Sequence, residues 1–82
     1  MPEYHYVYIL KSESEPSRHY TGCTTEITDR LARHNRGEVT HTAKHRPWRM
    51  ETVIRFVSQD KARAFEKYLK SGSGREFSRR HF

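Results

Sequence analysis

The chain has 82 residues and a formal net charge of +6 at pH 7. This length excludes two domains, because a fold of this size removes only about 60% of its unfolded surface from water. We therefore expect one domain over residues 1–82, and the periodic apolar patterns described below exclude wholesale disorder.

The basic residues are concentrated downstream in the chain. Residues 1–29 contain two Lys/Arg against five Asp/Glu, whereas residues 30–82 contain 14 against five. This asymmetry, with a sequence pI of about 9.8, favours a polyanionic partner, because cations placed at phosphates release condensed counterions. A charged surface that serves only solubility is the alternative.

Cys23 is the single cysteine of the chain. It excludes an intramolecular disulfide and a zinc site built from several cysteines, and it suits a reducing compartment. The N-terminal residues lack the basic flank and apolar run of a secretory signal, and no stretch approaches the roughly 20 apolar residues of a membrane span. We expect a cytoplasmic protein that makes no use of a membrane.

Two strands joined by a polar turn are predicted first. Residues 4–10 are mostly aromatic or β-branched with apolar side chains on both parities, which is typical of a strand buried on both faces. Residues 12–18 form a polar turn, and residues 19–24 return as the second strand of a hairpin. Tyr8 and Tyr20 are then expected on neighbouring strands.

A helix is predicted over residues 25–37, with Thr25 as its N-cap and Gly37 as its C′ glycine. The i,i+4 spacing places Ile27 near Leu31 on the inner side and Arg30 near His34 on another shared face. The apolar residues within 38–48 follow neither a helical nor a strand periodicity, so we predict a basic loop there.

The C-terminal third predicts a strand and two helices. Residues 50–57 alternate in a way that suits a third, antiparallel strand. Ser58 is a cap candidate for a helix that carries Glu66 near the edge of its apolar stripe. Residues 71–74 should stop this helix, and Ser73 with Glu76 predicts a capping box that opens a short last helix through Phe77.

The order of these residues resembles the GIY-YIG nuclease family. Tyr6-Val7-Tyr8 stands in the first motif and Tyr20-Thr21-Gly22 in the second, followed by Arg30, His34 and a late helical Glu66. The resemblance covers nearly the whole chain and is closest to short stand-alone bacterial members. It implies an α/β (α+β) fold, a three-stranded antiparallel sheet flanked by helices in the order β-β-α-β-α-α.

The resemblance also implies a catalytic role for each matching residue and one divalent ion, Mg²⁺ or Mn²⁺. Tyr8 would help deprotonate the attacking water, with His34 as a proton relay, and Tyr20 would lie at the scissile phosphate and share the basic role. Arg30 would neutralise the phosphoryl charge, and Glu66 would bind the metal.

Elementary chemistry is compatible with these implied roles. A tyrosine has a reference pKa of about 10, so it is a poor base at neutral pH unless a cation lowers its proton affinity. The planar fork of Arg30 suits a phosphate, and the single carboxylate of Glu66 suits Mg²⁺, which keeps several waters. Tight metal binding without substrate is not expected.

Each of these residues also has a structural alternative. Strand tyrosines are commonly core residues, a role that we favour for Tyr6. Arg30 at i,i+4 from Glu26 would form a surface ion pair, and Glu66 would pair with Lys70 or Arg63. A histidine such as His34 at a helix C-terminus also interacts favourably with the helix dipole.

The first helix, the loop and the last two helices supply the expected nucleic-acid contacts, which are Arg33, Lys44, His45, Arg46, Lys70 and Arg75. In the same loop, Trp48 either stacks on a base or anchors the loop in the core, and the core role is favoured. His41 and His45 share a spacing that suits zinc, but no further ligand cluster supports such a site.

The sequence therefore predicts a metal-dependent endonuclease that hydrolyses nucleic-acid phosphodiesters, with DNA favoured over RNA. The alternative is a non-catalytic nucleic-acid-binding module, because larger relatives carry an asparagine downstream of the metal-binding glutamate and the single asparagine here is Asn35. A protein-interaction adaptor leaves the tyrosines, Arg30 and Glu66 unexplained. We expect a monomer without an obligate protein partner.

Overall fold

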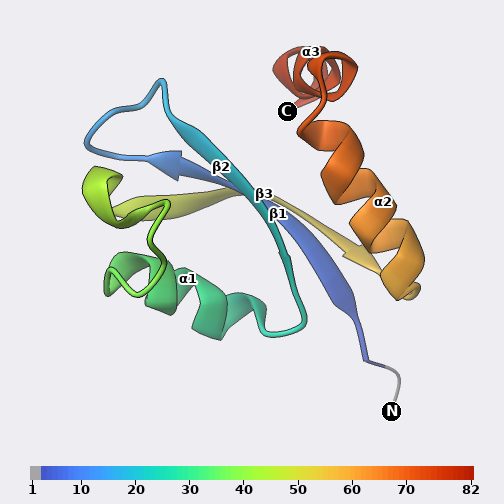
Figure 1. The fold of residues 1–82 in the computed structure, drawn as a ribbon, viewed down its shortest axis with the longest axis horizontal. Helices are drawn as coiled ribbons and strands as arrows, with labels where there is room; N and C mark the ends of the chain where they lie inside the picture. The colour runs from blue at the N-terminus through green and yellow to red at the C-terminus, as the bar shows by residue number, and fades with distance from the viewer. Residues whose placement is uncertain (1–2) are drawn as a thin grey trace.

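The computed structural model describes residues 3–82, and these contain a three-stranded antiparallel sheet (Figure 1). The strands are β1 (His5–Ser12), β2 (His19–Thr24) and β3 (Trp48–Phe56), in the spatial order β2-β1-β3. The central position of β1 explains why its side chains are apolar on both parities. Tyr8 faces Gly22 across the β1–β2 ladder, which confirms the predicted hairpin.

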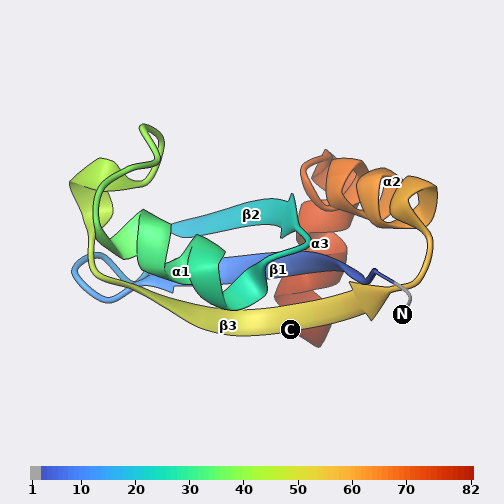
Figure 2. The same cartoon turned by 90° about the horizontal axis from the view of Figure 1, so that it is seen from below.

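The helices complete the predicted order β-β-α-β-α-α. They are α1 (Ile27–Asn35), α2 (Gln59–Leu69) and α3 (Gly72–His81), with a single 3₁₀ turn, η1 (Ala43–His45), before β3. Figures 1 and 2 show α1 and η1 toward one end of the sheet and α2 with α3 toward the other. No helix within residues 3–82 combines the length and the apolar character that crossing a membrane requires.

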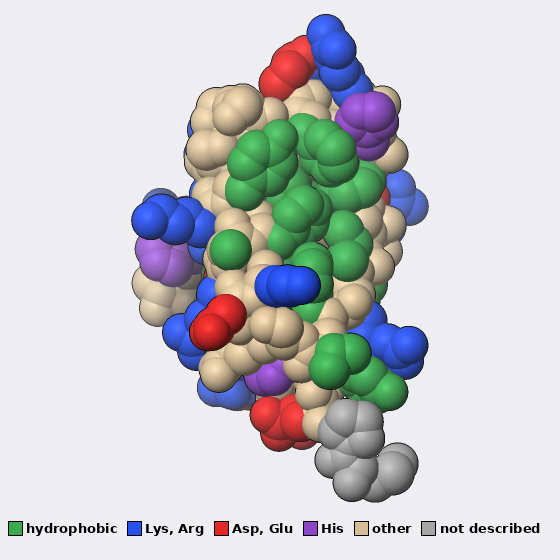
Figure 3. Space-filling view, turned by 90° about the vertical axis from the view of Figure 1, so that its right-hand side faces the viewer, with side chains coloured by type: hydrophobic (Ala, Val, Ile, Leu, Met, Phe, Trp, Pro, Cys, Tyr) green, Lys and Arg blue, Asp and Glu red, His purple; other side chains and the backbone are tan. Residues whose placement is uncertain are grey.

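The alternation of β1 divides the interior into two small cores on opposite faces of the sheet. Tyr8 and Leu10 pack with Trp48 and with the inner side of α1. Val7 and Ile9 pack with α2 and with aromatic side chains from β3 and α3. Hydrophobic side chains also reach the surface on the α2–α3 side (Figure 3), where Tyr68 and Phe82 are 40% and 42% exposed.

The first helix starts later than the sequence predicts. Thr25 does not cap α1; the N-cap is Glu26, whose side chain makes no capping bond. The hydroxyl of Thr24, the last residue of β2, accepts a hydrogen bond from the Glu26 amide at 3.0 Å. This bond holds the turn between β2 and α1. Gly37 ends the helix region with a φ of 78°, as predicted for a C′ glycine.

The last helix also differs from its prediction. Ser71, rather than Ser73, is the N-cap of α3, because its Oγ accepts from the Gly74 amide at 3.1 Å. The helix then continues to His81, well beyond Phe77. Gly74 lies so close to α2 that an added Cβ would clash with the Tyr68 carbonyl, so the two helices join through a tight turn.

The third strand is shifted from its predicted range of 50–57. It begins at Trp48 because Trp48 and Arg49 pair with Ser12 and Lys11 of the extended β1. An irregularity at Ile9 and Leu10 absorbs the change of register. Ser58 caps α2 as predicted, accepting from the Lys61 amide at 3.2 Å.

Candidate active site

Tyr8 and His34 form a buried hydrogen-bonded pair, and both are fully shielded from solvent. The Tyr8 hydroxyl lies 2.9 Å from His34 Nε2, and His34 Nδ1 lies 2.7 Å from Thr42 Oγ1. Thr42 Oγ1 in turn lies 3.3 Å from the Val39 carbonyl oxygen. The chain of contacts therefore runs from β1 through α1 into the loop before η1.

The carbonyl at the end of this chain fixes the direction of its hydrogen bonds. A carbonyl oxygen only accepts, so the Thr42 hydroxyl donates to Val39 and accepts from Nδ1–H of His34. Nε2 of the neutral imidazole is then the acceptor, and the Tyr8 hydroxyl donates to it. This assignment of the tautomer by bonding partners leaves the Tyr8 lone pairs available to accept another proton.

Burial keeps both members of the pair neutral at pH 7. It raises the pKa of Tyr8 to about 12, with Tyr20 acting in the same direction and Arg30 opposing both. It also lowers the pKa of His34, and the cationic Arg30 and Arg33 lower it further. Tyr8 is thus no phenolate at neutral pH, and His34 is free to accept a proton.

Gly22 makes room for Tyr8 at the sheet surface. A Cβ at Gly22 would clash with the Tyr8 hydroxyl, so the tyrosine ring occupies the space that a side chain of β2 would fill. Tyr20, two residues earlier on the same face of β2, lies against the pair, with ring centroids 5.0 Å from His34 and 6.4 Å from Tyr8. The glycine of the second motif is therefore required by this contact.

Two residues that the sequence did not single out as functional hold the network in place. Thr42 is fully buried, and its carbonyl accepts from Trp48 Nε1 at 2.7 Å. The Asn35 amide exchanges two hydrogen bonds with the Trp48 backbone, at 3.0 and 2.7 Å. Trp48 is 4% exposed, which confirms the core anchor and excludes base stacking in this structure. No local pattern marks Thr42, because its partners lie on other elements.

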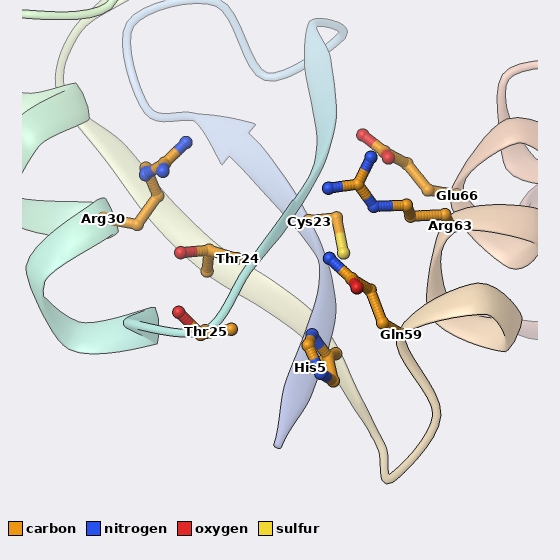
Figure 4. Close-up of a pocket in the computed structure, with 8 residues that line it drawn as sticks. All are labelled: His5, Cys23, Thr24, Thr25, Arg30, Gln59, Arg63 and Glu66. Atoms are coloured by element: carbon orange, nitrogen blue, oxygen red, sulfur yellow. The ribbon is translucent and has the colours of Figure 1, made fainter. Parts of the chain in front are cut away.

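A cavity of about 400 Å³ lies at the edge strand β2 and brings Arg30 and Glu66 together (Figure 4). Figure 4 shows Arg30 entering from α1 and Glu66 from α2, with β2 between them. The full lining is His5, Cys23, Thr24, Thr25, Arg30, Gln59, Arg63 and Glu66. Arg30 lies one helical turn before His34 on α1, so this helix connects the cavity to the buried pair.

The two key charges of the cavity differ in their partners. Within residues 3–82 the guanidinium of Arg30 has no carboxylate within 4.0 Å, so the alternative pairing with Glu26 is absent. Glu66 does pair with Lys70, with Nζ 3.1 Å from Oε2, while its carboxylate also lines the cavity. Arg30 is thus available to an anion.

The carboxylate of Glu66 fits a divalent ion that keeps most of its water. No group of three or more His, Cys, Asp or Glu side chains capable of holding a metal exists among residues 3–82. Mg²⁺ is usually bound through one or two carboxylates and substrate phosphate oxygens. Arg30 and Arg63 in the same cavity repel a dication, so a phosphate that offsets their charge would favour its binding.

The six predicted nucleic-acid contacts divide into two groups. Arg33 pairs with Glu38 at 3.4 Å, His45 pairs with Glu15 at 2.9 Å, and Arg46 donates to the Ala43 carbonyl. Together with the exposed Lys44, these residues lie outside the cavity, around α1 and η1 and away from α3 (Figures 1 and 2). Lys70 and Arg75 line a second cavity beside α3.

Fold and site together define a domain of the GIY-YIG catalytic type. The family model described as the GIY-YIG catalytic domain matches residues 4–80. The chain therefore belongs to the GIY-YIG family, which confirms the resemblance seen in the two motifs.

The similar proteins are fungal and bacterial. The chain is 39% identical over 74 residues to the structure-specific endonuclease subunit SLX1 of Scheffersomyces stipitis, covering 80% of this chain and 22% of that protein. It is 37% identical over 75 residues to SLX1 of Meyerozyma guilliermondii, covering 83% and 25%. The chain spans about a quarter of the length of these curated relatives or less.

A solved structure shares both the fold and much of the length. The solution NMR structure of UPF0213 protein BH0048 from Bacillus halodurans matches with a TM-score of 0.53 and 32% sequence identity. The match covers 89% of this chain and 79% of that chain. A bacterial protein of similar size therefore shares the overall fold.

Proposed function

We propose that this protein is an endonuclease that hydrolyses nucleic-acid phosphodiester bonds, with DNA favoured over RNA and one Mg²⁺ or Mn²⁺ as cofactor. The observation that carries the proposal is the cavity at β2, where Arg30 and Glu66 face one space beside the Tyr8–His34 pair. Membership in the GIY-YIG family and the two relatives named as endonuclease subunits support the same class of reaction.

Arg30 is the residue that receives the phosphate. Its guanidinium lines the cavity without a carboxylate partner, and a planar fork donates two parallel hydrogen bonds to phosphate oxygens. As negative charge builds up on those oxygens in the transition state, a fixed cation stabilises it. Tyr20 lies against His34 on the same face of the sheet and donates its hydroxyl to the same phosphate.

Tyr8 takes the proton of the attacking water and His34 takes the proton of Tyr8. A pKa of about 12 rules out a standing phenolate, so Tyr8 accepts the water proton while its own hydroxyl proton moves to Nε2. His34 is neutral beforehand because its pKa is lowered, and the imidazolium that forms keeps its Nδ1–H bond to Thr42.

Glu66 would hold the divalent ion. When bound, such an ion withdraws electron density from the phosphate and stabilises charge on the leaving oxygen. Lys70 pairs with the same carboxylate and competes with the ion for it. We therefore expect weak metal binding by the free protein and stronger binding when a phosphate is present.

Cleavage assays separate this proposal from a module that binds nucleic acid without cutting it. Labelled DNA and RNA are incubated with the protein in Mg²⁺, Mn²⁺ or EDTA. We expect metal-dependent products that Glu66→Gln abolishes while binding in EDTA remains. Glu13→Gln is the matched control, because Glu13 is exposed and lines neither cavity. Salt-sensitive binding without products in any metal would establish the module instead.

The proposal includes action as a monomer in the cytoplasm. The domain contains Tyr8, Arg30, His34 and Glu66 in one chain, so no second copy is needed to assemble these four groups. The fungal relatives are named as subunits, but this name describes those longer proteins and not this chain. Light scattering of the purified protein with and without a short oligonucleotide tests this part, and a dimer in both samples would contradict it.

A further inference from the structure

A second and larger cavity, of about 740 Å³, adjoins the candidate active site. Both cavities follow β2 and α2. Cys23 of β2 lines the first cavity and Thr21, on the same side of the strand, lines the second. On α2, Glu66 lines the first and Lys70 the second, and these two residues are joined by their ion pair. The two cavities therefore lie end to end.

The wall of the second cavity is strongly basic. Glu51 is the one acidic side chain among the described lining residues, whereas four lining side chains are Lys or Arg, namely Lys11, Lys70, Arg75 and Arg79. Within residues 3–82, Lys11 and Arg75 have no carboxylate partner within 4.0 Å. Tyr20, which lies against the Tyr8–His34 pair, is also part of the lining. Unpaired cations beside the candidate site attract further phosphates of the same strand.

Apolar side chains complete the lining. Ile9 and Leu69 are each 4% exposed, and Phe82 is 42% exposed while its ring meets Phe77 edge-on. A duplex presents phosphates and groove edges on its outside, whereas the faces of its bases are stacked inside. An apolar and aromatic surface between cations therefore gains most from a strand whose bases are unpaired, because each base can stack or pack there.

We propose that this second cavity binds an unpaired stretch of nucleic-acid strand that leads away from the scissile phosphate. The inference rests on the proposed function, because it extends the path of the same strand from the β2 cavity across Lys70 to α3. Arg75 and Arg79 contact phosphates, and Phe82 stacks on a base. The cavity thereby makes an unpaired strand next to the cut part of what the protein recognises.

The test compares two double variants that remove equal charge. Arg75→Ala/Arg79→Ala removes two cations from the wall of the second cavity. Lys67→Ala/Arg80→Ala removes two cations that line neither cavity. Arg79 and Arg80 both pair with Glu76 on α3, so each double variant loses one of these bonds. Circular dichroism and thermal melting establish that both variants are folded.

Binding is measured by fluorescence anisotropy in EDTA, with labelled single-stranded 12-mers of DNA and RNA and a blunt duplex. We expect Arg75→Ala/Arg79→Ala to weaken single-strand binding about ten-fold or more. The slope of log binding constant against log salt concentration should become shallower by roughly 1.4, because each lost phosphate contact on a single strand contributes about 0.7. The control double variant should lose less than about half of that slope. Equal losses in both double variants, or an equal loss for the duplex, would overturn the proposal.

The stacking role of Phe82 has its own readout. Phe82→Ala should weaken binding of an intact 12-mer about five-fold or more and leave an abasic 12-mer with the same phosphates unchanged. An equal effect on both oligomers contradicts the base contact. These measurements need no cleavage, so a protein that binds as described but yields no products refutes the proposed function alone. Unchanged affinities in a protein that cleaves normally refute the cavity proposal alone.

Discussion

The two faces of the sheet carry different parts of the candidate site. On the α1 face, Tyr8, His34 and Thr42 are fully buried and joined by directional hydrogen bonds. On the α2 face, Glu66 and Lys70 are partly exposed, with side chains 24% and 51% accessible. Proton transfer requires fixed distances in a dry environment, whereas ion and phosphate binding requires access from solvent.

The comparison also explains why β2 is the place where the faces meet. Within residues 3–82 it is an edge strand, so side chains from both faces of the sheet reach the cavity beside it. Arg30 is on the α1 side and Glu66 on the α2 side, yet both face the same space (Figure 4). A substitution should therefore act differently according to the face that it changes.

The largest effect is expected from removing the hydroxyl at the centre of the buried face. Tyr8→Phe abolishes the bond to His34 and should lower kcat about 10²–10⁴-fold, with little change in binding. Tyr20→Phe is the matched variant and should lower kcat less, because Tyr20 has no bond to His34 within residues 3–82. Single-turnover kinetics measure both, and a larger loss for Tyr20→Phe would reverse the roles of the two tyrosines.

Filling the space at Gly22 should disturb the buried face next most strongly. Gly22→Ala places a Cβ against the Tyr8 hydroxyl, and such overpacking costs about 1–3 kcal/mol. We expect reduced stability in chemical denaturation and an activity loss of about 10-fold or more. Gly72→Ala is the control, since nothing lies within 4 Å of an added Cβ there. Equal behaviour of the two variants would contradict the close contact.

Thr42→Val should show whether Thr42 acts by orienting the His34 ring rather than by taking part in the reaction itself. Valine has nearly the same shape as threonine but leaves Nδ1–H of His34 without its acceptor. A buried donor without a partner lowers the free energy of unfolding by about 1–3 kcal/mol. We expect kcat to fall about 10-fold, with a changed pH profile, while KM stays near that of the unmodified protein. Thr42→Ser should restore most of the activity. Thr28→Val, on the exposed side of α1, should have no effect on kcat.

The smallest effect is a dependence of stability on acid. Because the pKa of His34 is lowered in the folded state from its ordinary 6.5, the unfolded chain binds the proton more readily. The contribution of His34 to the free energy of unfolding is therefore present above pH 6.5 and is lost as pH falls through the folded pKa. Denaturation of His34→Gln should show a shallower decline over this window. An unchanged decline would mean that other groups control it.

The residues that could be predicted from sequence are those whose neighbours are local or periodic. Alternation in β1 and β3, the hairpin pairing of Tyr8 with the second strand, and the Ser58 cap each depend on spacing within one or two elements. The motif order then located Arg30 and Glu66, which the structure brings to one cavity. Their catalytic roles stay predictions, as do those of Tyr8, Tyr20 and His34.

What the sequence could not supply depends on contacts between distant elements. Thr42 is bound to His34 and to Trp48, and neither bond has a local signature. The predicted start of α1 is wrong because the Thr24 hydroxyl accepts from the Glu26 amide, and the predicted start of α3 is wrong because Ser71 caps it. The basic cavity is lined in part by Ser78, Arg79 and Phe82, so a last helix that ended at Phe77 would not have indicated it.

The tight turn at Gly74 has a consequence for how such a domain can diversify. The residues that we propose for proton transfer lie within the first 48 positions, whereas α2 and α3 lie beyond residue 58 and pack tightly against each other at this glycine. Glu66 on α2 belongs to the proposed ion site, so exchanging this helical pair as one unit would change both the strand that is bound and the carboxylate that holds the ion. Strand recognition and ion binding would therefore change together, while the buried hydrogen-bonded residues of β1 and α1 stay in place.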